Sequence, residues 1–357
     1  MVLALMAGVG GWSAVTGSLP FLRDKEHYCW GAWEQDSGPR VLGEDALSAG
    51  GSRSAEESPP TAGRPSGSCT LTVRATSEAG GEEISYADRV AVRYGAAPRE
   101  AAERRAWLGE FLDARSVRLP GGLSGTVGRD RAVVVLPERC DAGGRPVAVT
   151  LRAHGRGASA SGEAANPTVL GTDGQVAAML LDVANAGMRE ADCAPGTPLA
   201  LDGGLPGGAA EKDRSGLVPR EACEIPGLRG GPGTSTWSWS RADDERLRIC
   251  SVETDAARGE EPEFAGQFLV VDAPRLVALF DGMAGDKAPG PGWRGKGVVR
   301  GDHALVRAEC GGRPTVFFQQ LADGMRKAAE PDPRGVFAEG ADAAARQAGC
   351  ERIAPAP

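Results

Sequence analysis

The sequence of 357 residues lacks the patterns that usually mark a metal site or a nucleic-acid-binding surface. Its eight cysteines form no CxxC pair, its three histidines (His27, His154 and His303) stand far apart, and no basic run offsets the net charge of −8. Structural zinc sites bring their ligands in close pairs, and binding to nucleic acid requires a basic surface. We therefore expect no metal, no cofactor and no nucleic-acid partner.

Aromatic residues are also scarce, at 5% of the chain, and only five of the 40 basic residues are lysine. The excess of arginine over lysine is typical of a GC-rich bacterial genome. Hydrophobic residues at 41% and charged residues at 25% indicate a globular protein, and the length allows two hydrophobic cores. The 52 glycines and 25 prolines predict long loops.

Charge is absent from the first 22 residues, Met1 to Leu22. About 20 apolar residues span a bilayer, so we predict a transmembrane anchor or an uncleaved signal at 1–22, with the bulk of the chain outside the cytoplasm. A buried helix is the third alternative, which Gly8, Gly10 and Gly11 disfavour. A span with its N-terminus inside the cell usually follows a Lys or Arg, and none precedes this segment. We therefore expect the natural start to lie upstream.

All eight cysteines follow that apolar segment. Exported proteins meet an oxidising environment in which disulfides persist, so we predict that the cysteines form disulfides. Free buried thiols are the alternative. The cysteines are Cys29, Cys69, Cys140, Cys193, Cys223, Cys250, Cys310 and Cys350.

The chain contains an internal repeat with three anchors in the same order. The first anchor is the pattern V-x-x-D-x-A-x-V, which occurs at 127–134 and again at 299–306. It predicts the entry into a strand, and a cysteine follows each copy, at Cys140 and at Cys310.

The second anchor is Gly-Gly-Arg-Pro, at 143–146 and at 311–314, each time before an apolar run. Glycine tolerates positive φ and proline can begin a strand, so each copy predicts a turn between two strands of a hairpin. The third anchor is a predicted helix that closes at Cys193 in the first half and at Cys350 in the second.

Each half follows the order Cys, strand with Cys, strand, helix, strand ending at Cys, strand, helix ending at Cys. The sequence therefore predicts an α+β protein of two tandem homologous modules, each an antiparallel sheet covered by helices. We expect the first module at 23–194, a Gly/Pro-rich linker at 195–222 and the second module at 223–357. Two further stretches, 51–68 and 155–167, are expected to be extended surface loops or disordered.

The repeat restricts the disulfide pairing, because the cysteines of one module are expected to pair within that module. In each module the second bond would fasten the last helix to the end of a strand. The predicted pairs are Cys29–Cys69, Cys140–Cys193, Cys223–Cys250 and Cys310–Cys350.

No motif in the sequence specifies a reaction. The stretch 290–297 has the frame of a phosphate-binding loop, but Gly297 stands where a Ser or Thr must follow the lysine, so we expect a glycine-rich loop. His154 near Ser159 and Ser161 suggests a hydrolytic pair, yet the pattern G-x-S-x-G of a nucleophile elbow is missing.

The charged segments favour solvated surfaces over sites. Two acidic clusters, 243–245 and 260–263, lack the ligand spacing of a calcium loop. The mixed charges of 103–108 indicate a solvated helix face. His303 stands where the first half has Arg131, so we expect an exposed strand residue rather than a catalytic base.

Tyr28, Trp30 and Trp33 surround Cys29 in "EHYCWGAW", where either a membrane interface or core packing would explain them. With "YCWGAW" followed by "SCTLTV" at Cys69, the chain resembles uncharacterised, membrane-anchored or secreted envelope proteins of GC-rich Gram-positive bacteria. Those proteins have paired-cysteine α+β domains, some of them Mog1/PsbP-like. The resemblance implies export and the binding of a ligand or partner, and it transfers no functional residue.

These patterns together predict a non-enzymatic binding, sensing or scaffolding protein of the bacterial cell envelope. It would be a single-pass protein of the cell membrane with a protein or cell-wall partner. The alternative is an extracytoplasmic hydrolase with a site in a module cleft. A deep pocket of converging titratable side chains would favour the enzyme, and a groove or an exposed apolar patch would favour the binding protein.

Overall fold

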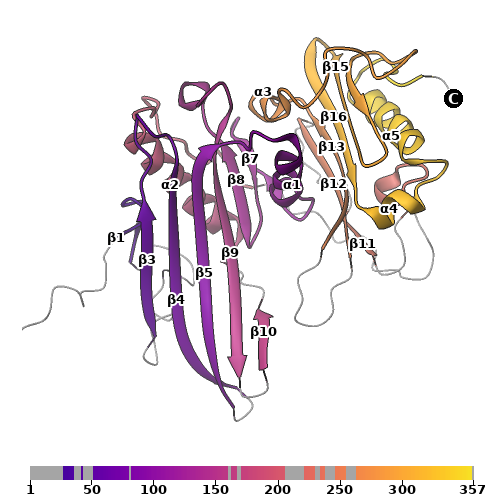
Figure 1. Cartoon of the computed structure of the whole chain (residues 1–357). Helices are drawn as coiled ribbons and strands as arrows, with labels where there is room; N and C mark the ends of the chain where they lie inside the picture. The colour runs from indigo at the N-terminus through magenta and orange to yellow at the C-terminus, as the bar shows by residue number, and fades with distance from the viewer. Residues whose placement is uncertain are drawn as a thin grey trace, which may run out of the picture.

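The computed structural model of the chain describes residues 27–35, 42, 51–79, 82–159, 162–166, 170–205, 221–229, 234–237, 246–254 and 263–355. Over these ranges the chain forms antiparallel sheets and helices, which confirms the α+β prediction (Figure 1). The predicted anchor at 1–22 lies outside the described ranges. Within them, every helix is too short or too polar to serve as a membrane span.

Two large sheets organise the chain, and we call them sheet 1 and sheet 2. Sheet 1 has the strand order β3-β4-β5-β9-β8-β7-β6, and β10 pairs with the end of β9. A short hairpin of β1 (His27–Tyr28) and β2 (Trp33–Glu34) precedes it. The strands of sheet 1 are β3 (Ser52–Ser58), β4 (Gly67–Ala79), β5 (Glu82–Ala96), β6 (Val117–Arg118), β7 (Ser124–Val127), β8 (Arg131–Val135), β9 (Val147–Ser159) and β10 (Gly162–Asn166).

Sheet 2 has the strand order β11-β12-β13-β16-β15-β14 and is also antiparallel. Five of its strands, β12 to β16, occupy the same places in the order as β4, β5, β7, β8 and β9 of sheet 1. The strands of sheet 2 are β11 (Thr234–Trp237), β12 (Leu247–Thr254), β13 (Phe264–Val271), β14 (Lys296–Val299), β15 (His303–Cys310) and β16 (Arg313–Leu321).

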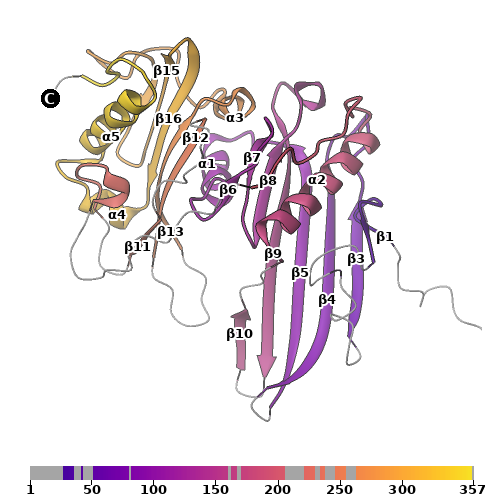
Figure 2. The same ribbon diagram turned by 180° about the vertical axis from the view of Figure 1, so that it is seen from behind.

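The helices form layers with the two sheets (Figures 1 and 2). One face of sheet 1 is covered by α2, one face of sheet 2 by α4 and α5, and α1 and α3 lie between the sheets. A capping box of Thr172 and Gln175 begins α2, which turns its apolar side to sheet 1. The helices are α1 (Ala101–Phe111), α2 (Asp173–Glu190), α3 (Pro274–Val277), α4 (Asp323–Ala328) and α5 (Pro333–Gln347).

Apolar side chains are buried in three cores that follow this layering. The first core lies between α2 and sheet 1, the second between α5 and sheet 2, and the third joins the two halves of the chain around α1 and α3. Large members are Leu71, Val92 and Leu180 in the first core, Phe268, Phe317 and Phe337 in the second, and Leu112, Leu269 and Phe318 in the third.

Two glutamines of sheet 2 fasten α1 by hydrogen bonds. Gln267 Nε2 donates to the carbonyl oxygen of Leu112 at the C-terminal end of α1. Gln320 Nε2 donates to Gln267 Oε1 at 2.9 Å and to the carbonyl oxygen of Arg105 at 3.0 Å. Buried amides that are fully hydrogen-bonded fix one orientation of the elements that they join.

Two arginines cross between the halves in opposite directions. Arg104 of α1 is buried and donates from Nη1 to the carbonyl oxygen of Asp281 at 2.7 Å. Arg275 of α3 donates from Nη1 to Asp141 Oδ2 at 3.0 Å. The expected solvated helix face at 103–108 is therefore wrong for Arg104, because α1 packs against the second half.

The structure contains four disulfides, and their pairing is the one predicted. All eight cysteines are used, which indicates an oxidising, extracytoplasmic setting. Cys140–Cys193 and Cys310–Cys350 each join the segment at the end of a strand, β8 or β15, to the end of a helix, α2 or α5. The other two bonds are Cys29–Cys69 and Cys223–Cys250.

Both Gly-Gly-Arg-Pro segments form the predicted hairpin turns, between β8 and β9 and between β15 and β16. The arginine of each turn reaches the end of a neighbouring strand: Arg145 Nη1 donates to the carbonyl oxygen of Ala97 at 2.5 Å, and Arg313 Nη2 lies 3.0 Å from Asp272 Oδ2. Positive φ explains the glycines. The φ angles are 58° and 70° at Gly143 and Gly144, and 57° and 77° at Gly311 and Gly312.

Two of the predicted loose stretches contain strands, so that expectation is wrong. Residues 51–68 include β3 and the start of β4, and 155–167 include the end of β9 and β10. These strands pair through their backbones and are rich in Gly, Ser and charged residues, so their composition gave no strand signal. In the expected linker, Leu199 packs against the first core and its N–H donates to Asn185 Oδ1 at 2.9 Å.

Candidate ligand-binding groove

Among the described residues, no helix covers β4 and β5 on one face of sheet 1 (Figures 1 and 2). A groove of about 760 Å³ crosses β4, β5 and β9 on this face, between α1 and the turn that follows β3. We call it the sheet groove, and its volume is typical of ligand sites. Its lining includes Arg64, Ser66, Ser68, Ala91, Arg93, Gly95, Trp107, Glu110, Phe111, Ala148, Thr150, Arg152 and His154.

The alternation of side chains along β5 produces the floor of the groove. Val90, Val92 and Tyr94 are buried in the first core, beneath α2. Ala91 and Arg93, between them in the sequence, therefore face the groove.

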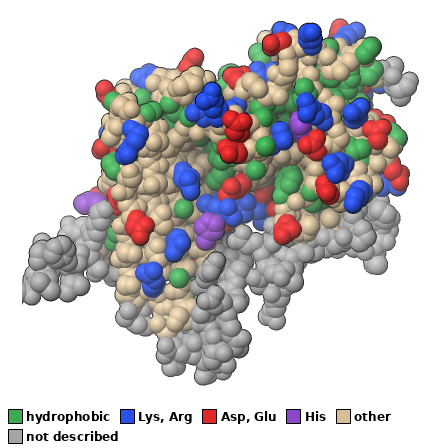
Figure 3. Space-filling view, viewed as in Figure 1, with side chains coloured by type: hydrophobic (Ala, Val, Ile, Leu, Met, Phe, Trp, Pro, Cys, Tyr) green, Lys and Arg blue, Asp and Glu red, His purple; other side chains and the backbone are tan. Residues whose placement is uncertain are grey.

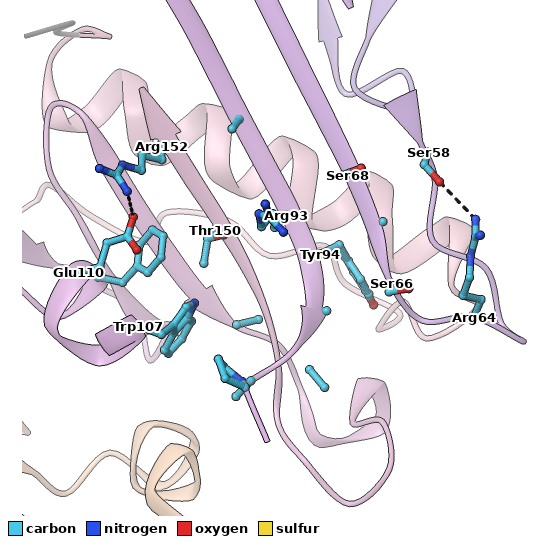
Figure 4. Close-up of a pocket in the computed structure, with 18 of the residues that line it drawn as sticks. Ser58, Arg64, Ser66, Ser68, Arg93, Tyr94, Trp107, Glu110, Thr150 and Arg152 are labelled. Carbon is cyan, nitrogen blue, oxygen red and sulfur yellow. Dashed lines mark hydrogen bonds and ion pairs between the residues drawn. The ribbon is translucent and has the colours of Figure 1, made fainter. Parts of the chain in front are cut away.

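The strand register places small side chains around Arg93. Ser68 of β4 and Thr150 of β9 are its partners on the two sides. In the next row along the strands, Gly95 pairs with Ala148. The floor is therefore flat and consists of small side chains, with one guanidinium group near its centre (Figure 4).

Helix α1 forms one wall of the groove. The rings of Trp107 and Phe111 lie 5.5 Å apart and give this wall an aromatic surface. Beside them, Glu110 Oε1 accepts a hydrogen bond of 2.6 Å from Arg152 Nη1, which joins α1 to β9 (Figure 4). Both charged side chains are about one-third exposed, so this pair lies at the solvent side of the groove.

The turn between β3 and β4 forms the opposite wall. The backbones of Thr61 and Arg64 exchange hydrogen bonds of 2.9 and 3.0 Å, and Arg64 Nη2 donates to Ser58 Oγ at 3.2 Å. A Cβ at Gly67 would lie 2.6 Å from Pro60, so glycine allows the turn to fold closely over the start of β4.

The groove is basic although the whole chain has a net charge of −8. Three arginines, Arg64, Arg93 and Arg152, line it with one carboxylate, that of Glu110. Among the described residues the Arg93 guanidinium has no ion-pair or hydrogen-bond partner. On the face in Figure 3, arginine side chains are spread over sheet 1, which contains no lysine. Such a site attracts an anionic group.

Tyr94 lies behind the groove floor and belongs to the core. Burial raises the pKa of its hydroxyl to about 12, and the oxygen lies 3.2 Å from Cys193 Sγ. Its ring contacts Trp30 edge-on at 6.4 Å. Tyr94 therefore supports the floor and is no proton donor or acceptor for a bound molecule.

A second cluster of charged side chains lies where α1 ends. Arg115 Nη2 lies 2.7 Å from Asp113 Oδ2 and 3.0 Å from Glu253 Oε1. Burial lowers the pKa of Arg115, but the two carboxylates raise it more, so the guanidinium stays charged. Because Glu253 belongs to sheet 2, this cluster joins the two halves and leaves no charge for a ligand.

The three histidines lie in separate places. His27 is exposed in β1, His154 lines the sheet groove, and His303 is in β15. The side chain of His303 is only 13% exposed, with Nδ1 3.0 Å from Asp302 Oδ1, so the expected exposure is wrong. Ser159 is five residues beyond His154 along β9, and Ser161 lies outside the described ranges.

The glycine-rich stretch 290–297 is a loop that leads into β14, as expected. Trp293 in this loop stacks on Phe337 at 5.8 Å and so packs on the second core. Of the acidic clusters, Glu263 is exposed next to β13, whereas 243–245 and 260–261 lie outside the described ranges.

Core packing explains the aromatic residues around Cys29. Tyr28 and Trp33 are buried, and Trp33 Nε1 donates to the carbonyl oxygen of Met179 in α2 at 3.0 Å. Over the part of the chain that the structure describes, no group of three His, Cys, Asp or Glu residues could hold a metal ion.

The prediction from sequence missed the groove residues Trp107, Arg93 and Arg152. The signal was present in "ADRVAVRY", where alternation sets Arg89 and Arg93 on the face opposite the buried valines. What the pattern lacked was any sign that this face stays open.

Comparison of the chain with protein-family models, with curated proteins and with solved structures finds no match in any of the three. Function is therefore inferred from the chemistry of the sheet groove and from the disulfides.

Proposed function

We propose that this chain is a non-enzymatic binding protein of the bacterial cell envelope that takes up its ligand in the sheet groove. The observation that carries the proposal is the open, basic groove, in which the Arg93 guanidinium has no partner among the residues that the structure describes. The four disulfides support a location outside the cytoplasm. Residues 1–22 would hold the protein in the cell membrane as a single-pass anchor.

We also propose that the two halves are homologous modules. Support comes from the common strand order and from the equivalent disulfides. The leading cysteines give further support, because Cys29 and Cys223 both have the uncommon left-handed backbone, with φ of 52° and 55°.

The geometry of the groove favours binding over hydrolysis. A hydrolase needs a nucleophile within about 3 Å of a general base. Thr150 and His154 are four residues apart on β9, which corresponds to roughly 13 Å. His154 is opposite Arg89 in the register, and Ser68 is opposite Arg93. The hydroxyls and the imidazole are therefore spread along the groove and do not converge.

Sedimentation with isolated cell envelopes tests this proposal. The full disulfide-bonded chain in mild detergent is mixed with envelopes of the producing bacterium, and the bound fraction is measured. We expect Arg93→Glu to reduce binding at least tenfold, because the charge of the groove is reversed. Arg74→Glu is the matched control, since Arg74 is exposed on β4 and does not line the groove.

Equal sedimentation of Arg93→Glu and the wild type would overturn the groove as the binding site. Steady release of soluble envelope fragments by the wild type would overturn the non-enzymatic part of the proposal and favour the hydrolase. Location is tested separately with a C-terminal epitope tag, which we expect antibodies to reach in intact protoplasts. A tag that becomes accessible only after lysis would contradict the proposed orientation.

A further inference from the structure

We infer that the ligand of the sheet groove is a short oligosaccharide that carries carboxylate or phosphate groups. This inference rests on the proposed binding function and specifies its ligand. It follows from where the groove lies in the sheet, which side chains line it, and how its charge compares with that of the chain.

The groove lies on the face of a sheet and not at an edge. Its floor strands β4, β5 and β9 are hydrogen-bonded to one another along their lengths, through Ser68, Arg93 and Thr150 among others. An extended peptide binds to a sheet by adding a strand at an edge, where unpaired backbone groups provide affinity. The backbone of this floor is already paired, so a ligand must be recognised by side chains alone.

The side chains of the groove suit a hydroxylated ring. Ser66 and Ser68 are exposed and carry hydroxyls that both donate and accept hydrogen bonds. Small residues such as Gly95 leave room for a flat ring to approach the floor. Trp107 offers an apolar aromatic surface at the wall, against which the C–H face of a sugar can pack.

The charge of the groove selects an anionic ring over a neutral one. Arg152 is paired with Glu110, whereas the Arg93 guanidinium has no partner among the described residues. A guanidinium binds carboxylate or phosphate through two parallel hydrogen bonds. Arg64, on the opposite wall, adds a second positive charge, and its Nη2 donates to the hydroxyl of Ser58 at 3.2 Å. The volume of about 760 Å³ is enough for more than one ring.

Isothermal titration calorimetry of the full chain in detergent tests the inference with four probes. Trigalacturonic acid and a phosphorylated maltotriose supply rings with the two kinds of negative charge. The trimethyl ester of trigalacturonic acid keeps the rings and removes the charge. Hexaglutamate keeps the charge and removes the rings.

We expect at least one of the two anionic sugars to bind the wild type and Arg74→Glu. The sugar that binds shows whether the anionic group is a carboxylate or a phosphate. The ester and hexaglutamate should bind at least tenfold more weakly than that sugar. Arg93→Glu and Trp107→Ala should each weaken its binding at least tenfold. Trp107→Leu, which keeps apolar bulk at the third core, separates loss of the ring surface from loss of packing.

Two outcomes overturn the inference and leave the proposed function intact. The first outcome is that hexaglutamate binds as tightly as the sugars, which would mean that the groove recognises negative charge and not sugar rings. The second outcome is that both anionic sugars fail to bind, or fail to displace the chain from cell envelopes, although sedimentation still depends on Arg93. This result would exclude an anionic glycan as the ligand. If that sedimentation is also absent, the proposed function itself fails.

Discussion

The strands that the two sheets have in common follow the same order, but the sheets use the corresponding faces in opposite ways. Cys69 pairs with Val92 in sheet 1, and Cys250 pairs with Phe268 in sheet 2, which fixes the comparison residue by residue. The adjacent row across three strands is Ser68, Arg93 and Thr150 in sheet 1, and Ile249, Leu269 and Phe318 in sheet 2. The first row lines the sheet groove, and the second is buried in the third core.

The difference shows how one topology supports two roles. Apolar side chains on sheet 2 bury α1 and α3, which joins the halves. Ser68 and Arg93 on sheet 1 are exposed, and small polar or basic side chains gain little from burial, so this face stays in contact with solvent over β4 and β5. The second half thereby holds α1 in place, through Gln267 and Gln320, as a wall of the groove in the first half.

The largest expected effect on the free energy of unfolding comes from exchanging the residues at one matched position, Arg93 of sheet 1 and Leu269 of sheet 2. Leu269 is fully buried, and Leu269→Arg would place an unpaired charge in the third core, at a cost of about 5 kcal/mol. Arg93 is exposed, and Arg93→Leu should change the free energy of unfolding by less than about 0.5 kcal/mol. Urea denaturation followed by circular dichroism measures both.

The milder variant Leu269→Ala keeps this test informative if Leu269→Arg does not fold. It should still cost about 2–5 kcal/mol, because it leaves a cavity. Similar effects of substitutions at positions 93 and 269 would contradict the assignment of an open face to sheet 1 and a buried face to sheet 2.

The disulfides that end the two halves should make nearly equal contributions. Cys140–Cys193 closes a separation of 53 residues and Cys310–Cys350 one of 40. In the chain-entropy model each stabilises by about 4 kcal/mol. Replacing both cysteines of either pair by serine should lower the urea midpoint by similar amounts. The third core predicts a single transition in each variant.

Two separate transitions in either serine variant would contradict the joining of the halves by the third core. The wild type under the same oxidising conditions is the reference, and a thiol assay on the unfolded variants verifies that the three remaining bonds stay closed.

The residues also explain which features the sequence could predict. Cysteine pairing and the Gly-Gly-Arg-Pro turns depend on local order that repeats along the chain, so the pattern alone was sufficient. The strand β7 (Ser124–Val127) contains Gly125, where an added Cβ would collide with the Val133 carbonyl oxygen. The close pairing of β7 with β8 therefore requires glycine at this position. In the sequence alone, the same glycine-rich composition suggests a loop.

The groove could not be predicted, because it depends on where α1 packs. The apolar spacing predicts one helix face of Trp107, Leu108, Phe111 and Leu112, and all of these except the half-buried Trp107 are buried. The spacing could not tell that this side would face the other half of the chain, or that Trp107 at its margin would line an open surface. Such contacts join residues more than 100 positions apart, as Gln320 and Arg105 do.

The smallest expected effect concerns the matched acids Asp130 and Asp302. Burial raises the pKa of Asp130, but hydrogen bonds from Arg131 and the charges of Arg131 and Arg115 outweigh it, so the pKa lies below its ordinary value. Burial likewise raises the pKa of Asp302, and the hydrogen bond and charge of His303 lower it more. A carboxylate with a depressed pKa stabilises the fold at pH values above its pKa in the unfolded chain, about 3.9. This stabilisation is lost as the pH falls through the pKa of the group in the folded protein.

Asp130→Asn should therefore lower the free energy of unfolding at pH 7 by about 1 kcal/mol, a modest figure because the carboxylate is partly exposed. Asp302→Asn should have a smaller effect, since Asp302 is more exposed and its contact to His303 Nδ1 is 3.0 Å against 2.7 Å for Asp130 Oδ2 to Arg131 Nη2. Both variants should approach the wild type as the pH falls below about 4, where the wild-type carboxylates take up protons. Urea titrations at several pH values measure this convergence, and a deficit that grows in acid would contradict the stabilising role of the two carboxylates.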